Sequence, residues 1–124
     1  IDLIKATGKN QANVIDVKTG HCDGKSQQLS PEGDYFRQLV FYKLLCQQAK
    51  GFPYQIENGT IDFIEANYKK QFVQKTFKLT QEDVEKLKVL ITDTFQKISN
   101  LEFAPSPTCD DPDHLHYLFD KYFK

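Results

Sequence analysis

Two aspartates and a lysine near the start of the chain have residue types and a spacing that suit a cation site. Asp2 lies in one short apolar run, and Asp16 and Lys18 lie in the next. A hairpin whose turn is centred on Lys9 places Asp2 directly across from Asp16, with Lys18 on the same face because side chains alternate along a strand. Facing carboxylates repel, so they need a cation or water. The pattern predicts either a divalent metal site or two solvated aspartates neutralised by Lys18.

The hairpin itself is predicted from two runs that contain β-branched residues, at 1–5 and 13–19. The turn-forming sequence Thr7-Gly8-Lys9-Asn10 separates them, which is typical of antiparallel strands. A shift of the turn by one residue would move Asp2 to the opposite face of the sheet. The cation site therefore depends on this register.

The remaining elements predict an α/β fold with a mixed central sheet flanked by helices. A helix is expected over 34–50, ended by Gly51 and Pro53, and its apolar residues surround most of its circumference, so we expect burial between layers. Two strands are expected at 60–66 and 72–79, joined by a turn at 67–70. A near capping box at Thr80 opens a second helix to about Ser99. Its apolar stripe is expected in the core and comprises Val84, Leu87, Ile91, Phe95 and Ile98.

Polar residues near the hairpin are the next candidates for a site. Gln38 and Tyr42 are four residues apart, so they share one face of the predicted helix and could contact a ligand beside the hairpin. The alternative is that Gln38 is exposed and Tyr42 is a core aromatic residue with its hydroxyl hydrogen-bonded. His21 and Cys22 begin a surface loop over 21–33 and are expected near the site as bystanders rather than ligands.

Composition bounds the class of protein. With 124 residues, 40% hydrophobic and 27% charged, the chain is expected to form a single domain over 1–124. It contains no apolar run long enough to span a membrane and no signal-peptide pattern. The chain starts with Ile1 in mid-pattern and contains no Met, so we expect a fragment of a longer protein. Three widely spaced cysteines predict a reducing, cytoplasmic location without a disulfide framework.

Charge is unevenly distributed in a chain of net charge −1, which has no overall basic field for nucleic acid. A lysine cluster comprises Lys69, Lys70, Lys75 and Lys78. It could contact phosphates, although a solvated strand face is the commoner meaning of such a run. In the tail, Cys109, His114 and His116 have the residue types of zinc ligands, but a single cysteine without a CxxC partner favours a structural role.

The order of these residues resembles the PD-(D/E)xK nuclease superfamily, specifically the RecB/AddB-like nuclease domain of UvrD/Rep-type helicases. Three motifs carry the resemblance: Asp2 within Ile1-Asp2-Leu3-Ile4, Asp16-Val17-Lys18 at the end of the next strand, and Gln38-x-x-x-Tyr42 on the following helix. The helix start at 79–83 and the tail Phe103-x-Pro105-x-Pro107-x-Cys109 extend it over nearly the whole chain. The resemblance implies a restriction-endonuclease-like core whose N-terminal part is missing.

The resemblance also implies an activity and roles for residues. The protein would be a metal-dependent DNA nuclease, expected to act as an exonuclease, associated with a helicase in DNA double-strand break repair or recombination. Asp2, Asp16 and the backbone carbonyl of Val17 would bind Mg²⁺ or Mn²⁺. Lys18 would orient the attacking water and offset phosphate charge. Gln38 and Tyr42 would contact DNA or brace the site.

Two departures from the family pattern qualify this expectation. Family members usually carry a glutamate on a helix before the first strand, and the chain begins after that position. Many relatives hold an iron–sulfur cluster with four cysteines, whereas the tail here has Cys109 alone, with Pro112 where the next cysteine would be expected. We therefore expect no intact iron–sulfur cluster. The alternative function is a catalytically degenerate nuclease fold that serves as a DNA-binding or helicase-docking module.

Overall fold

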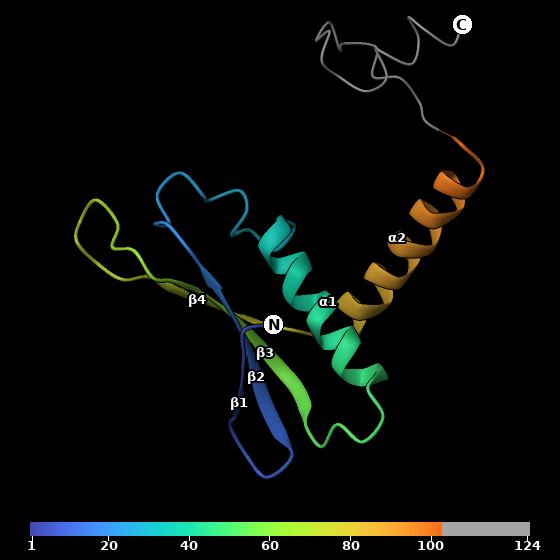
Figure 1. Cartoon of the computed structure of the whole chain (residues 1–124), viewed down its shortest axis with the longest axis horizontal. Helices are drawn as coiled ribbons and strands as arrows, with labels where there is room; N and C mark the ends of the chain where they lie inside the picture. Colours follow the sequence, from blue (N-terminus) through green and yellow to red (C-terminus); the bar gives the residue numbers. More distant parts are fainter. Residues whose placement is uncertain (103–124) are drawn as a thin grey trace, which may run out of the picture. The chain divides into compact units, whose positions relative to one another are not determined.

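The computed structural model describes residues 1–102 and contains four strands and two helices in the order ββαββα (Figure 1). The elements are β1 (Leu3–Ala6), β2 (Gln11–Lys18), α1 (Asp34–Gln48), β3 (Gln55–Phe63), β4 (Gln74–Lys78) and α2 (Gln81–Ser99). The chain divides into two units after Lys88. The first unit holds the sheet, α1 and the start of α2, and the second begins within α2 at Val89.

The sheet is mixed, as predicted, and its strands lie in the order β1-β2-β3-β4. The outer pairs β1–β2 and β3–β4 are antiparallel, whereas the central pair β2–β3 is parallel. Parallel neighbours need a crossover between them, and α1 provides it. The carboxyl ends of β2 and β3 consequently lie at the same edge, where Lys18 is paired with Phe63.

The core lies between α1 and one face of the sheet. Along β2, buried Ala12, Val14 and Asp16 alternate with partly or fully exposed neighbours, the period-two pattern of a strand with one covered face. The largest fully buried side chains are Phe63, Leu39, Ile61, Val14 and Val84. Asp16 therefore points to the same covered face as the apolar core residues.

The contact between α1 and β3 is close because it uses a glycine. A Cβ at Gly59 would lie 2.9 Å from Leu39 Cβ, so only glycine lets the helix approach this near without a shift. β3 begins at Gln55 rather than at the predicted position 60. Asn58-Gly59 has the composition of a turn, which favours a later start in the sequence, but both residues lie inside the strand. The strand also ends at Phe63, three residues earlier than predicted.

The prediction that α1 is buried on nearly all sides is wrong. Leu39, Val40 and Cys46 are buried, but Phe41 and Leu45 on the opposite side are 41% and 45% exposed. The helix ends at Gln48, and Gly51 in the following turn has a φ of +77°. One side of α1 packs on the sheet, and the other side presents apolar residues at the surface of the described chain.

The start of α2 follows the prediction, but its apolar stripe does not. Thr80 N–H donates to Asp83 Oδ2 at 2.8 Å, and Asp83 N–H donates to the Thr80 hydroxyl at 3.2 Å, which is a reciprocal cap. Val84 and Leu87 are buried as expected. Ile91, Phe95 and Ile98 are exposed, so the prediction that they belong to the core is wrong.

The loops also differ in part from expectation. The segment 21–33 is a succession of hydrogen-bonded turns, such as Leu29 N–H to Lys25 C=O at 3.0 Å. Of the lysine cluster, Lys69 and Lys70 lie in the turn between β3 and β4, and Lys75 and Lys78 lie in β4. The predicted tail helix and its candidate zinc ligands Cys109, His114 and His116 lie outside the described residues. Among the described residues, neither helix combines the length and apolarity that crossing a membrane requires.

Candidate active site

The hairpin has the register that the cation hypothesis required. Leu3 pairs with Ile15 and Ile4 with Val14, so the next position outward places Asp2 across from Asp16. Asp2 lies just before β1, and its N–H donates to the Ile15 carbonyl at 3.3 Å. The two aspartates are therefore brought to adjoining strands at one end of the hairpin.

Asp16 is a buried carboxylate surrounded by polar groups. It is 4% exposed, in a row of otherwise apolar core residues. Its Oδ1 accepts hydrogen bonds from the Tyr42 hydroxyl at 2.8 Å and from Gln38 Nε2 at 3.3 Å. A charge buried this deeply is tolerated only when it is paired and hydrogen-bonded. Three side chains, Tyr42, Gln38 and Lys18, supply those partners.

Lys18 provides the opposite charge. Its Nζ lies 2.6 Å from Asp16 Oδ2 and donates to Gln38 Oε1 at 2.7 Å. The same ammonium lies 4.8 Å from the centre of the Tyr35 ring, on the first turn of α1, a cation–π contact. Three contacts thus hold Lys18 at the end of β2 rather than leaving it free in water.

The residues on α1 connect the aspartate and the lysine. Gln38 Nε2 donates to the Tyr42 hydroxyl at 2.6 Å, and that hydroxyl donates its proton to Asp16. Burial and the negative charge of Asp16 raise the pKa of Tyr42 above its usual 10.0, with a further contribution from the charge of Asp2. The phenol therefore remains a donor at neutral pH. Gln38 is partly buried rather than exposed, whereas Tyr42 packs against the core with its hydroxyl hydrogen-bonded. Both contact Asp16, and a ligand contact by either residue stays a prediction.

Asp2 is placed beside this cluster but is held differently. Its side chain is exposed, and Oδ2 accepts the Val17 N–H at 2.7 Å. Because the N–H and C=O of a strand residue point to the same edge, the Val17 carbonyl also faces the β1 side of β2, toward Asp2. The two carboxylates and the Val17 carbonyl therefore belong to one end of β2, with Asp16 buried and Asp2 in solvent.

The donor set fits a hard divalent cation. Asp16 Oδ2 is fully buried, yet among the described residues it accepts no hydrogen bond, because its contact with Lys18 has the distance of an ion pair without hydrogen-bond geometry. No group of three or more His, Cys, Asp or Glu side chains within residues 1–102 could hold a metal ion. Mg²⁺ needs no such group, since it usually keeps several waters and binds through one or two carboxylates. Asp2, Asp16 and the Val17 carbonyl offer only oxygen atoms, which suits it.

Tyr35 belongs to this cluster through its contact with Lys18, and it was not among the residues that the sequence singled out. Its spacing was a usable signal, because Tyr35, Gln38 and Tyr42 recur at the three- and four-residue steps of one helix face. His21 Nδ1 lies 3.3 Å from Asp23 Oδ2, and Cys22 packs against the core. Their expected role as bystanders stays a prediction.

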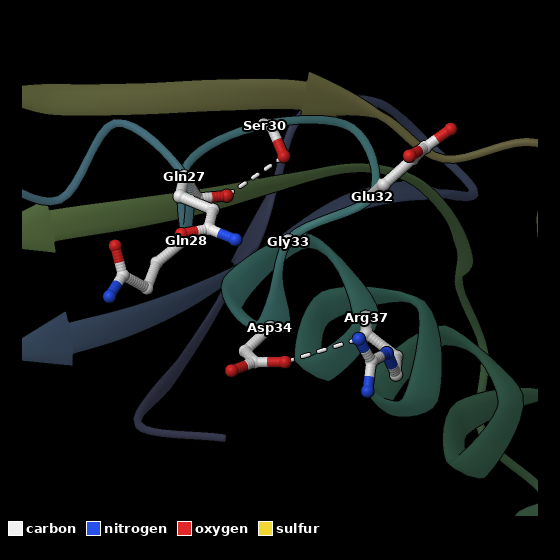
Figure 2. A pocket seen from close by; sticks show the side chains of 7 residues that line it. All are labelled: Gln27, Gln28, Ser30, Glu32, Gly33, Asp34 and Arg37. Carbon is white, nitrogen blue, oxygen red and sulfur yellow. Dashed lines mark hydrogen bonds and ion pairs between the residues drawn. The ribbon is translucent and has the colours of Figure 1, made fainter. Parts of the chain in front are cut away.

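A separate pocket of about 380 Å³ lies in front of the first turn of α1 (Figure 2). Its lining includes Glu32 and Asp34, and Asp34 Oδ1 accepts from Arg37 at 3.1 Å. None of the residues that contact Asp16 lines it. This pocket is therefore distinct from the cluster around Asp16.

A mixed four-stranded sheet with α1 on one face, and an Asp-x-Lys sequence ending a central strand, defines an α/β fold consistent with the restriction-endonuclease-like class. The family model of the PD-(D/E)XK nuclease superfamily matches residues 1–111, and the chain belongs to this superfamily. Members of this superfamily are mostly nucleases that use divalent metal ions. No curated protein and no solved structure matches the chain significantly.

Proposed function

We propose that the protein is a Mg²⁺- or Mn²⁺-dependent deoxyribonuclease that hydrolyses phosphodiester bonds. The observation that carries this proposal is the buried Asp16 carboxylate, paired with Lys18 and aligned by Gln38 and Tyr42. Membership of a nuclease superfamily supports the same chemistry. Exonuclease activity, association with a helicase and a role in double-strand break repair rest on the order of the motifs.

In this proposal Asp2, Asp16 and the Val17 carbonyl hold the metal ion. When bound, the ion supplies Lewis acidity and lowers the pKa of coordinated water. Asp16 is held in one orientation by the Tyr42 hydroxyl and Gln38, so it needs little rearrangement on binding. Asp2 is exposed and is held by one hydrogen bond, from the Val17 N–H at 2.7 Å, which must be exchanged if Oδ2 is to bind the ion.

Lys18 has the second role. Its ammonium is held next to Asp16 by Gln38 and the Tyr35 ring, where it can orient a water molecule and offset the charge of a phosphate. Gln38 is a positioning residue, because it bonds to Lys18, Tyr42 and Asp16 at once. A DNA contact by Gln38 or Tyr42 requires that these hydrogen bonds be exchanged. We therefore propose that both residues chiefly brace Asp16 and Lys18.

The test is cleavage of labelled DNA by the whole protein that carries this chain, with Mg²⁺ or Mn²⁺ present. Asp16→Asn and Lys18→Gln are each expected to lower cleavage at least about 100-fold, because general acid–base and electrostatic contributions are of this size. The control is Asp62→Asn on neighbouring β3, whose carboxylate accepts from Gln74 at 2.8 Å. It should cleave at the wild-type rate.

Unchanged cleavage by either site variant, with the fold intact by circular dichroism, would remove the assignment. A wild-type protein that binds DNA but does not cleave it with any divalent metal would instead support the alternative function. That alternative is a nuclease-like fold retained as a DNA-binding or helicase-docking module.

A further inference from the structure

We propose that the β3–β4 turn, residues 64–73, is a docking surface for single-stranded nucleic acid. Unpaired bases would stack on Tyr68, and the phosphates would contact Lys69 and Lys70. The inference deepens the proposed function and rests on it for the identity of the substrate.

The first observation is the exposure of large apolar side chains in this short turn. Tyr68 is 83% exposed and Phe72 is 72% exposed, and Ile64 at the base of the turn is also exposed. A single exposed apolar residue needs no explanation, but three large ones in one ten-residue turn are all available for contact with a ligand. Aromatic rings offer flat faces on which any base can stack.

The second observation is that hydrogen bonds fix the shape of the turn. Asn67 Oδ1 accepts from the N–H groups of Lys69 and Gln71, both at 2.9 Å. The Asn67 N–H also donates to the Gln71 carbonyl at 2.9 Å. Lys70 takes the turn with a φ of +59°. The aromatic and basic side chains are therefore presented on a preformed backbone, which lowers the entropy cost of binding.

The position of Tyr68 is fixed further by the segment that follows β2. Its N–H donates to Asp23 Oδ2 at 2.9 Å, and its ring centre lies 5.0 Å from that of His21. The His21 ring thus contacts the phenol, while most of the Tyr68 side chain faces solvent. An exposed ring on a held backbone is available for stacking by a base.

The third observation is local charge. The stretch 64–75 carries Lys69, Lys70 and Lys75 against Glu65 alone, in a chain whose net charge is −1. Glu65 Oε1 accepts the Gly20 N–H at 3.0 Å, which holds that carboxylate at the base of the turn. Exposed lysines next to exposed rings match phosphates next to unpaired bases. In a duplex the base faces are already stacked, so the rings favour a single strand.

The turn also lies at the edge of the sheet that carries the site. Ile64 N–H donates to the Lys18 carbonyl at 3.2 Å, and Glu65 N–H donates to the Gly20 carbonyl at 3.3 Å. Figure 1 shows the turn extending beyond the sheet at the end where the chain leaves β2. A strand held on Tyr68 is therefore bound at the same edge as Lys18.

Fluorescence anisotropy with a labelled single-stranded oligonucleotide tests the proposal, in EDTA so that metal-dependent cleavage cannot occur. Tyr68→Ala is expected to raise Kd at least about 5-fold, the lower limit for one stacked base, while Tyr68→Phe should bind as wild type. Replacing Lys69 and Lys70 by Gln should reduce the slope of log K against log salt by about 1.4, or about 0.7 for each phosphate. A duplex of equal length should bind more weakly.

The controls are matched by exposure and charge. Phe95→Ala removes a ring that is 69% exposed on α2, and a Lys9→Gln, Lys50→Gln pair removes two exposed lysines elsewhere. Both should leave Kd unchanged. The proposal is overturned by wild-type binding of Tyr68→Ala, by equal affinity for duplex, or by absence of oligonucleotide binding in the wild type. If the wild type binds the oligonucleotide through Tyr68 but does not cleave DNA with Mg²⁺ or Mn²⁺, only the nuclease function is overturned.

Discussion

The Tyr42 hydroxyl links the two halves of the site, since it accepts from Gln38 and donates to Asp16. Tyr42→Phe removes a donor to a buried carboxylate and is expected to lower the free energy of unfolding by about 1.5–3 kcal/mol at neutral pH. The pKa of Tyr42 is raised in the folded chain, so this contribution is fully present below pH 10.0 and is lost as pH rises through the higher folded value. Urea unfolding of the wild type and of Tyr42→Phe, from neutral pH to above pH 10.0, measures the difference in their free energies of unfolding. This difference should narrow as the pH rises.

The control for this experiment is Tyr68→Phe, which removes an exposed hydroxyl and should follow the wild type at every pH. Ultraviolet titration supplies a second readout, because the difference between wild type and Tyr42→Phe isolates one of six phenols. A Tyr42 midpoint at or below 10.0 would show that the phenol is not held against the carboxylate.

For individual residues of the site, the sequence predicted the local contacts well and the longer-range contacts poorly. The pairing of Asp2 with Asp16 depends only on a short turn and a two-residue period, both visible in the sequence. The roles of Gln38 and Tyr42 stayed open because helical spacing shows which residues share a face but not what that face meets. Tyr35 was missed for the same reason, since its contact with Lys18 joins α1 to β2.

Among the elements, α1 positions the site only if it stays close to β3. Gly59→Ala would place a methyl group 2.9 Å from Leu39 Cβ and 3.0 Å from both Leu39 Cδ atoms, so the helix must shift. Overpacking of this kind is expected to cost about 1–3 kcal/mol of stability. Leu39 follows Gln38 directly, so cleavage should fall as well. Chemical denaturation and the DNA cleavage assay measure the two effects.

Gly8→Ala is the matched control, because the nearest atom to its added Cβ is the end of the flexible Gln11 side chain at 3.0 Å. It should change stability by less than about 0.5 kcal/mol. Equal stability of Gly59→Ala and wild type would mean that the helix–sheet contact is looser than described.

The elements themselves were predictable where local chemistry decides them. The cap at Thr80 and the hairpin turn depend on neighbours in sequence, and both were confirmed. The partners of the apolar faces were not predictable. Leu45 and Ile91 have the periodicity of core residues, yet both are exposed in the described chain, because a period identifies an apolar face without saying what covers it.

Across the whole molecule, charge separates the two proposed surfaces. The site contains two aspartates, of which Asp16 pairs with Lys18, whereas the β3–β4 turn is basic, within a chain of net charge −1. A polyanion would therefore be held at the turn, while the carboxylates remain available for a metal ion. Composition alone could not reveal this separation, since the net charge is almost neutral.

Binding of a metal ion at the two carboxylates should also raise the stability of the folded protein. A ligand that binds only the folded state stabilises it by about 1.4 kcal/mol at tenfold excess over Kd, which for a chain of 124 residues corresponds to a rise in Tm of about 4–8 °C. We expect Mg²⁺ or Mn²⁺ to produce this rise in the wild type and EDTA to reverse it. Asp16→Asn should lose the rise, because the buried ligand oxygen is replaced, whereas Asp62→Asn should keep it. Differential scanning fluorimetry without DNA measures all three proteins. An equal rise in Asp16→Asn would place the metal ion elsewhere on the molecule.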